Sequence, residues 1–403
     1  MREAKYLILG AGPSGLAAAN TLLDKGIDDF IILEKEKKAG GLCRTEYVNG
    51  QPVDFGGGHI LDTRSRKVDE FVFRFLPEKE WNSFERDSQI YFRGQFMGSP
   101  FEAHIWQLPI EEQVKYLKAI AVAGCNLGEP APEKFIDWIQ WKLGAKIAED
   151  YMLPYNKKMF SDKLNSLGTY WLEKLPNVSF EETLMSCLEH RFYGTQPCHS
   201  HFYYPKNEGF GDIFIRMAER LGERFYSNED VKKVDFSTNT VNDRFKGEVL
   251  IVAMPWTEFH EITGMPEEIR NGISKLAYSS VQIDYYRKDL PYKTSAQWIY
   301  YPEEKYSFHR IMAMTNFALG SSGYWTETNG ERISLNTDKS DFHYLNQYAY
   351  PMNTLEKPQI MDKLLHWGRE NKVYGLGRWG EWQHYNADVC MERAMNLIEE
   401  LER

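Results

Sequence analysis

The sequence predicts an α/β protein in which a parallel sheet with covering helices is interrupted by a mainly helical segment and by an antiparallel sheet. Three observations lead to this prediction. The first forty residues alternate between strand and helix, residues 66 to about 195 carry apolar side chains at helical spacing, and residues from about 278 to 340 alternate between apolar and polar. The 403 residues, 42% of them hydrophobic, are enough for two or three globular domains.

The N-terminal segment predicts one strand–helix–strand unit. Residues 5–10 (KYLILG) form a short apolar strand, and residues 29–34 (DFIILE) form a second one, both typical of a buried parallel sheet. Residues 13–26 (PSGLAAANTLLDKG) have helical composition and end at a glycine. This unit is the start of a Rossmann-type domain.

A phosphate-binding turn lies inside this unit. Gly10, Gly12 and Gly15 form the pattern G-x-G-x-x-G between the strand and the helix. Glycine there lets the backbone approach a pyrophosphate, which the amides at the helix N-terminus can bind. Glu34 ends the second strand, where its carboxylate can accept hydrogen bonds from ribose hydroxyls. The turn and the acid together predict a dinucleotide site.

A second glycine-rich turn favours FAD over NAD as this dinucleotide. Residues 40–45 (GGLCRT) and 53–60 (VDFGGGHI) follow the acid, and a cofactor that continues past its pyrophosphate toward an isoalloxazine ring needs such a turn. The first domain is therefore expected to be an FAD-binding Rossmann-type domain. Its expected cofactor-binding residues in this region are Gly10, Gly12, Pro13, Ser14, Gly15, Glu34, Lys35, Gly41, Leu42, Gly57 and Gly58.

The middle of the chain predicts helices and then a return to strands. Apolar residues recur at helical spacing in residues 67–76, 110–124, 133–152 and 181–192. A helix is expected at 209–225, and residues 248–255 (EVLIVAMP) have the composition of another parallel strand. Alternation predicts antiparallel strands within residues 279–289, 296–304, 309–317 and 332–338. A last strand at 372–377 and a terminal helix complete the chain.

These elements predict three interleaved domains. The FAD-binding domain comprises residues 1–65, 200–277 and 355–403, the mainly helical substrate domain residues 66–199, and the antiparallel sheet domain residues 278–354. No internal repeat or linker separates them.

Composition limits the possible partners and the compartment. The net charge is −10 and no basic tract occurs, which argues against nucleic acid as a partner. The five cysteines are scattered without C-x-x-C spacing, so we expect reduced thiols and no metal site. The N-terminal apolar run is too short for a signal peptide, and no run of ~18 apolar residues predicts a membrane span. A cytoplasmic protein is expected.

Six motifs stand in an order and spacing that resemble one family. They are GGGHI at 56–60, LPIEEQVKYL at 108–117, YMLPYNKKMF at 151–160, QWIYYPEEKYSFHR at 297–310, YAYPMNTLE at 348–356 and GRWGEWQHYNAD at 377–388. With them, almost the whole chain resembles the FAD-dependent oxidoreductases of the glutathione-reductase and amine-oxidase type. Within these it is most similar to the UDP-galactopyranose mutases, especially their eukaryotic-like branch.

The resemblance implies an isomerase for a nucleotide-diphosphate sugar. Such a mutase interconverts the pyranose and furanose forms of a UDP-sugar, UDP-galactose above all, for polysaccharide biosynthesis. The flavin must be reduced, because its N5 attacks the anomeric carbon and displaces the diphosphate. An external reductant such as NAD(P)H or a reductase is then a partner, and a homo-oligomer is possible.

The resemblance also assigns roles to individual residues. Those assigned to the substrate are Tyr151 and Tyr155 on uracil, Asn156 and Phe160 in the sugar pocket, Tyr300, Arg310 and Tyr350 on the diphosphate, and His384 or Tyr385 near the phosphates. Those assigned to the cofactor, besides the glycine turns, are His59, Val231, Arg378, Asn386 and Asp388. The catalytic residues are His59, Arg310 and Lys174. Each also has a structural interpretation, as a core aromatic residue, a surface charge or a helix cap.

Three departures from the family pattern leave the substrate open. Lys174 stands where the family has a second arginine, and an ammonium group cannot replace a bidentate guanidinium. His384 stands where a tyrosine is expected, and Ser99 and Glu102 replace an aromatic residue and an amide at the nucleotide end. A different nucleotide sugar would fit these changes.

Two other functions remain compatible with the sequence. The first is an FAD-dependent oxidase or dehydrogenase of the amine-oxidase or protoporphyrinogen-oxidase type, which would have the same cofactor framework. The second is a flavin-binding scaffold without catalysis. Bleaching of the flavin by a substrate followed by oxygen uptake would indicate the oxidase, and a flavin that responds to no ligand would indicate the scaffold.

Overall fold

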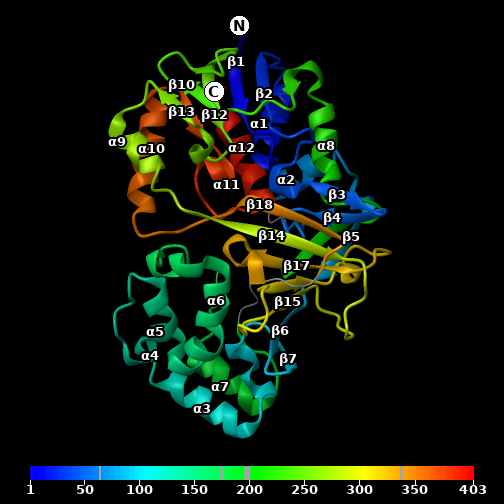
Figure 1. The fold of residues 1–403 in the computed structure, drawn as a ribbon, viewed down its shortest axis with the longest axis vertical. Coiled ribbons are helices and arrows are strands. Elements are labelled where there is room, and N and C mark those ends of the chain that lie inside the picture. Colours follow the sequence, from blue (N-terminus) through cyan, green and yellow to red (C-terminus); the bar gives the residue numbers. More distant parts are fainter. Residues whose placement is uncertain (63–64, 173–174, 176, 195–199, 336–338) are drawn as a thin grey trace.

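The computed structural model describes residues 1–62, 65–172, 175, 177–194, 200–335 and 339–403. It consists of a lobe that holds both chain ends, an antiparallel sheet below it and a group of helices at the opposite end (Figure 1). The predicted α/β class, with a parallel sheet, a helical segment and an antiparallel sheet, is confirmed. The division into three domains with the boundaries given above stays a prediction.

The first lobe is built on a sheet of eight strands. Strand β1 (Arg2–Leu9) pairs in parallel with β2 (Phe30–Leu33) on one side and with β12 (Phe245–Val252) on the other. Their inner residues are buried on both faces, as their continuous apolar sequence predicts. The other strands of this sheet are β9 (Phe225–Tyr226), β10 (Lys233–Asp235), β11 (Thr240–Val241), β13 (Glu261–Thr263) and β19 (Val373–Gly375).

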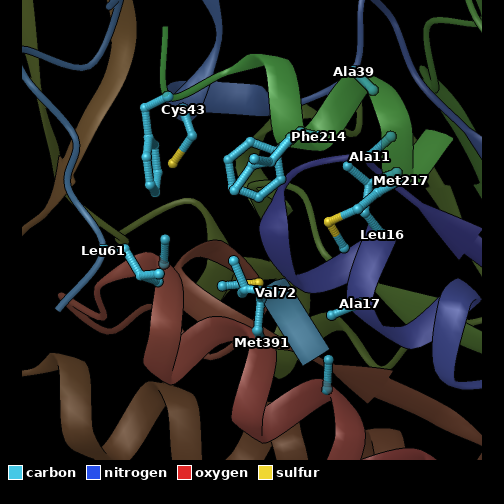
Figure 2. Close-up of a cluster of buried hydrophobic side chains, with 14 of the residues drawn as sticks. Ala11, Leu16, Ala17, Ala39, Cys43, Leu61, Val72, Phe214, Met217 and Met391 are labelled. Atoms are coloured by element: carbon cyan, nitrogen blue, oxygen red, sulfur yellow. The ribbon is translucent and has the colours of Figure 1, made fainter. Parts of the chain in front are cut away.

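Three helices from distant parts of the chain cover one face of this sheet. They are α1 (Pro13–Asp24), α8 (Asp212–Glu219) and α12 (Ala387–Leu401). Figure 2 shows Leu16, Phe214 and Met391, one from each helix, pointing into a single buried cluster. Truncating such a buried side chain to alanine costs about 2–5 kcal/mol, so this cluster fixes α12 against α1. The lobe also contains α2 (Arg66–Val72), α9 (Glu267–Ile273), α10 (Lys357–Glu370) and α11 (Gly377–Gly380).

The second sheet has seven strands. In order across the sheet they are β18 (Phe342–Pro351), β14 (Tyr278–Tyr286), β17 (Tyr324–Asn329), β16 (Arg310–Met312), β15 (Trp298–Tyr300), β6 (Ser88–Phe92) and β7 (Gln95–Gly98). All neighbours are antiparallel except β15 and β6, which are parallel. The structure also contains two-stranded antiparallel sheets formed by β3 (Thr45–Val48) with β4 (Gln51–Asp54) and by β5 (Trp81–Glu85) with β8 (His201–Pro205).

The helices at the far end come from one stretch of sequence. They are α3 (Ile110–Ala121), α4 (Gly124–Leu127), α5 (Phe135–Ile147), α6 (Leu153–Phe160) and α7 (Phe180–Glu189). Helices α3 and α5 lie within the segments predicted at 110–124 and 133–152, and α7 overlaps the segment predicted at 181–192. Helix α6 begins directly after the segment at 133–152 and was not predicted. Within the described ranges of the chain, no helix has the length and apolar character needed to cross a membrane.

The structure differs from the sequence predictions in two places. Residues 66–199 were expected to be mainly helical and no strand was named there, yet β5, β6 and β7 lie in this segment, and β6 and β7 join the second sheet. Arg93 and Gly94 have φ values of +49° and +86°, so a two-residue turn joins β6 to β7. The strand expected at 332–338 is replaced at Gly330–Leu335 by a 3-10 helix, because the Asn329 side chain accepts the Glu331 N–H at 2.9 Å and turns the chain.

Candidate functional site

Two adjoining cavities lie where the first lobe meets the antiparallel sheet. Their volumes are about 220 and 210 Å³. Both touch the second glycine-rich turn, β18 and the start of α12, and only the first also touches the turn at Gly10 and Gly12. The side chains and backbone common to both walls are those of Leu42, His59, Asn346, Arg378 and Ala387. A ligand in one cavity would therefore lie next to a ligand in the other.

The first cavity, here called the glycine-lined cavity, is the predicted cofactor site. The predicted residues on its wall are Gly10, Gly12, Pro13, Ser14, Glu34, Lys35, Gly41, Leu42, His59, Val231 and Arg378. A Cβ added to Gly12 would meet nothing nearer than the Gly41 Cα, at 3.9 Å. The two glycine turns thus leave open space where a side chain would otherwise stand, and this space suits the close approach of a pyrophosphate.

Glu34 joins the first glycine turn of this cavity to the loop that follows β2. Its Oε2 accepts the Ala11 N–H at 2.8 Å and its Oε1 accepts the Glu36 N–H at 3.0 Å. Burial raises the pKa of this carboxyl, although the two backbone donors oppose the shift. Each carboxylate oxygen has a second lone pair, so Glu34 can hold the turn and still accept a ribose hydroxyl.

The second cavity, here called the arginine-lined cavity, receives guanidinium groups from three separate segments. Arg86 follows β5, Arg310 begins β16 and Arg378 lies in α11. The other polar side chains on its wall are those of His59, Asp62, Asn346, Tyr350, His384, Asn386 and Asp388. The wall carries three arginines and two aspartates, and Glu327, which pairs with Arg310, is buried outside it. Three guanidinium groups on one wall offer several N–H donors, which suit an anionic ligand.

Arg310 is oriented by a buried carboxylate. Its Nη2 donates to both oxygens of Glu327 at 2.6 Å, and the Nε2 of His309 lies 3.4 Å from Glu327 Oε2. Burial raises the pKa of Glu327 but the neighbouring Arg310 outweighs it, so this pKa lies below its usual value. Arg310 Nε is buried and meets no acceptor in the part of the chain that the structure describes. One donor of this guanidinium is therefore available to a ligand.

Arg86 approaches the same region from the other side of Tyr300. Its Nη2 donates to the Tyr300 hydroxyl at 2.9 Å, and its Nε donates to Ser88 Oγ at 2.9 Å. Burial raises the pKa of Tyr300, but Arg86 and Arg310 together lower it below the usual value. Sequence reasoning missed Arg86, because a single arginine in the polar segment FERDS looks like a surface charge.

A row of aromatic rings leads from Tyr300 into the helical end of the molecule. Tyr155 meets Tyr300 edge-on at 5.6 Å between ring centroids, Tyr155 stacks on Tyr151 at 5.9 Å, and Tyr151 stacks on Phe101 at 5.1 Å. Glu102, directly after Phe101, is buried, and this burial raises its pKa to about 7. Flat aromatic rings of this kind stack on bases in nucleotide-binding proteins.

The C-terminal motif holds Arg378 in place. Its Nε donates to the Tyr385 carbonyl at 2.9 Å and its Nη1 to the Ala349 carbonyl at 3.2 Å. Trp382 is fully buried and donates through Nε1 to the Ala277 carbonyl at 3.1 Å. The motif therefore fixes an arginine at the junction of the two cavities.

His59 lies at the same junction as a neutral imidazole. Burial, and after it the nearby Arg378, lower its pKa to about 3. Its Nδ1 is buried, and no described residue offers it a hydrogen bond. A cofactor or substrate atom could supply that partner.

The remaining predicted residues have different surroundings. Gly57, Gly58, Asn386 and Asp388 line the arginine-lined cavity rather than the glycine-lined cavity, while Tyr385 lines the latter. Gly15 lines neither: its added Cβ would lie 1.9 Å from the Gly10 carbonyl oxygen, so it permits close packing. Tyr151, Tyr155, Asn156, Phe160 and Tyr300 lie outside both walls. Asn156 donates to the Met152 carbonyl at 2.8 Å, Phe160 ends α6, and Lys174 falls outside the described residues.

Comparison of the sequence with known proteins identifies a family. The model of the family described as flavin containing amine oxidoreductase matches residues 13–283, which is more than half of the chain. The tryptophan 2-monooxygenase of Allorhizobium ampelinum is 31% identical over 99 residues, 23% of this chain and 14% of that protein. The flavin-containing amine oxidase of Oncorhynchus mykiss is 21% identical over 277 residues, 62% of this chain and 49% of that protein. The chain thus spans half or less of the length of these curated relatives.

Solved structures agree with the predicted fold. Reduced UDP-galactopyranose mutase superposes with a TM-score of 0.89 at 22% identity, covering 99% of this chain and 94% of that one. Cyclohexylamine oxidase from Brevibacterium oxydans superposes with a TM-score of 0.66 at 14% identity, covering 99% and 100%. The predicted fold, an FAD-binding Rossmann-type domain with a helical insertion and an antiparallel sheet, is confirmed. Membership of the eukaryotic-like branch stays a prediction.

Proposed function

The chain belongs to the flavin containing amine oxidoreductases, and from this premise we propose that it is an FAD-dependent mutase acting on a nucleotide-diphosphate sugar. The reaction would interconvert pyranose and furanose forms, with UDP-galactose as the first substrate to test. The observation that carries the proposal is the arginine-lined cavity, where Arg86, Arg310 and Arg378 face a space next to the cofactor cavity. A diphosphate removed from water requires such cationic, bidentate partners.

Residues of the glycine-lined cavity would hold FAD. Gly10, Gly12 and Gly41 leave room for the pyrophosphate, and Glu34 would accept a ribose hydroxyl. Reduced FAD, when bound, supplies the nucleophilic N5 that attacks the anomeric carbon in the mutases that this chain resembles. The requirement for the reduced form and for an external reductant belongs to this proposal.

The chain's own residues would manage the charge of the diphosphate. When the bond between sugar and diphosphate breaks, negative charge increases on the departing oxygen, and Arg310 would stabilise it. Glu327 keeps Arg310 in one orientation through two hydrogen bonds of 2.6 Å. The Tyr350 hydroxyl on the cavity wall would donate a further hydrogen bond, and the Tyr300 hydroxyl, outside the wall, would orient Arg86. The neutral imidazole of His59 would contribute a hydrogen bond without adding charge.

The aromatic row would bind the nucleotide base. Tyr151 and Tyr155 lie nearly parallel, with an interplanar angle of 19°. Stacking a base on such rings contributes about 1–3 kcal/mol. Tyr300 is the last ring of the row and contacts Arg86. A nucleotide whose base stacks on the tyrosines would therefore direct its diphosphate toward the arginines.

An amine oxidase is the alternative that the family suggests. The guanidinium groups of this wall are hydrogen-bond donors, to which an anionic substrate offers acceptors and a protonated amine does not. This distribution of donors favours an anionic substrate and therefore the mutase.

The test is conversion of UDP-galactofuranose by the purified FAD-loaded protein, followed by chromatography with and without dithionite. Conversion only after reduction supports the proposal. Equal conversion without reduction contradicts the mechanism, and absence of conversion combined with flavin bleaching by an amine supports the oxidase.

A further inference from the structure

The arginine-lined cavity contains a cation to which the family pattern assigns no role. The resemblance gives Lys174 the place of the second diphosphate-binding arginine, and an ammonium group there lacks the fork of a guanidinium. Arg86 comes from a different element, the connection between β5 and β6, and its side chain lines the cavity together with Arg310. Two phosphates need more than one cation when they leave water.

The guanidinium of Arg86 is held in one orientation by three neighbours. Nε donates to Ser88 Oγ and Nη2 to the Tyr300 hydroxyl, both at 2.9 Å. The Cζ atom lies 4.8 Å from the centroid of the Trp298 ring, which also lines the cavity. These contacts fix both the direction and the plane of the group. A cation held in this way loses little conformational entropy when it binds an anion.

Strand pairing places these neighbours in register. Trp298 pairs with Ser88 across the parallel strands β15 and β6, and Tyr300 pairs with Arg310 across β15 and β16. Tyr300 therefore stands between the two guanidinium groups. Both guanidinium groups lower the pKa of the Tyr300 hydroxyl, whereas burial raises it. This agrees with the position of both groups near the Tyr300 hydroxyl.

We infer that Arg86 supplies the second guanidinium that binds the diphosphate of the substrate, opposite Arg310 across Tyr300. This inference rests on the proposed function and names a residue for it. Because strand residues of the second sheet hold Arg86, diphosphate binding in this protein would depend on a preformed pair of arginines.

Four variants of the FAD-loaded protein test this role. Arg86→Ala removes the group, and Arg86→Lys retains the charge without the fork. Lys174→Ala tests the residue that the family pattern favours. Arg93→Ala is the matched control, because Arg93 lies on the next hairpin turn, half-exposed, with Glu112 and Asp150 as partners. The readouts are flavin content, melting temperature, turnover of UDP-galactofuranose and dissociation constants for UDP and for uridine.

We expect Arg86→Ala to weaken the binding of the ligand that carries phosphates and not the binding of the nucleoside. Arg86→Ala retains FAD and binds UDP at least about 30-fold more weakly, while uridine binding is unchanged, because only UDP carries the partner charge. Arg86→Lys recovers only part of the loss, Lys174→Ala weakens UDP binding less than Arg86→Ala, and Arg93→Ala matches the parent protein.

Three outcomes would overturn the inference. Arg86→Ala could bind UDP as the parent protein does, or Lys174→Ala could weaken it more. Equal losses for UDP and uridine in Arg86→Ala would indicate a purely structural role. Failure of the proposed function itself is distinguishable, since then the unaltered protein binds no UDP and converts no UDP-galactofuranose.

Discussion

The two adjoining cavities differ in how the chain builds them. The glycine-lined cavity depends on short contiguous motifs, in which the backbone and missing side chains create the space. The arginine-lined cavity depends on side chains from β16, α11 and the segment after β5, which only the tertiary fold brings together. A local motif thus encodes the cofactor site, and strand pairing encodes the proposed substrate site.

This difference has a chemical counterpart. A pyrophosphate bound by backbone amides is recognised in the same way in many proteins. A substrate bound by charged side chains is recognised by their particular arrangement, here Arg310 opposite Glu327 in the β16–β17 register. Changes in the first cavity should therefore remove the cofactor, and changes in the second should leave it bound.

The largest effect is expected from Gly12→Val. Gly12 has extended backbone, with φ −77° and ψ −175°, which valine can adopt, so the protein should fold. The new side chain would fill the space between the glycine turns and exclude FAD. The flavin absorbance of the purified variant measures this, and a fully yellow variant would contradict it. Gly222→Asn, in an open turn that lines neither cavity, is the control and should retain flavin.

Arg310→Ala should give the opposite pattern, with FAD retained and turnover lost. Without its partner the buried Glu327 carboxylate would be unpaired, which costs about 3–5 kcal/mol in the free energy of unfolding. Loss of the diphosphate contact should lower kcat/KM by about 1000-fold. Urea unfolding and steady-state kinetics measure the two effects.

Replacing both partners separates stability from function. Arg310→Met combined with Glu327→Gln removes both charges, so much of the lost stability should return. Turnover should not return, because the diphosphate still lacks its guanidinium. Recovery of turnover in this double variant would remove Arg310 from the proposed site.

A smaller, pH-dependent effect is expected at the aromatic row. Burial raises the pKa of Glu102 from 4.5 to about 7, so the folded state favours the protonated carboxyl. The contribution of the protonated Glu102 to the free energy of unfolding is fully present below pH 4.5 and is lost as the pH rises through about 7. The total loss is roughly 3 kcal/mol. Glu102→Gln remains neutral and should therefore gain stability relative to the parent protein over this range.

Free energies of unfolding measured at about pH 5 and about pH 8 test whether Glu102→Gln gains stability over the parent protein as the pH rises. Glu111→Gln, at an exposed acid on α3, is the matched control for the loss of one carboxylate. A constant difference between Glu102→Gln and the parent protein at both pH values would mean that Glu102 does not titrate in this range.

The sequence predicted what local patterns determine. The strands around Gly10, the parallel strand at 248–255 and the helices of the middle segment follow from periodicity and composition. Strands β6 and β7 escaped notice because they are short, and their only local signal is the turn at Arg93 and Gly94. The contribution of Arg86 depends on the pairing of β6 with β15, residues more than two hundred positions apart. No local pattern encodes such a contact.

The most direct test of the central claim is a titration of the FAD-loaded protein with UDP, uridine and cyclohexylamine, followed by flavin absorbance. The arginine-lined cavity should bind UDP and perturb the flavin spectrum, with affinity that falls as salt increases, while uridine should require a much higher concentration. Bleaching of the flavin by the amine, with no response to UDP, would contradict the claim that this cavity binds a diphosphate.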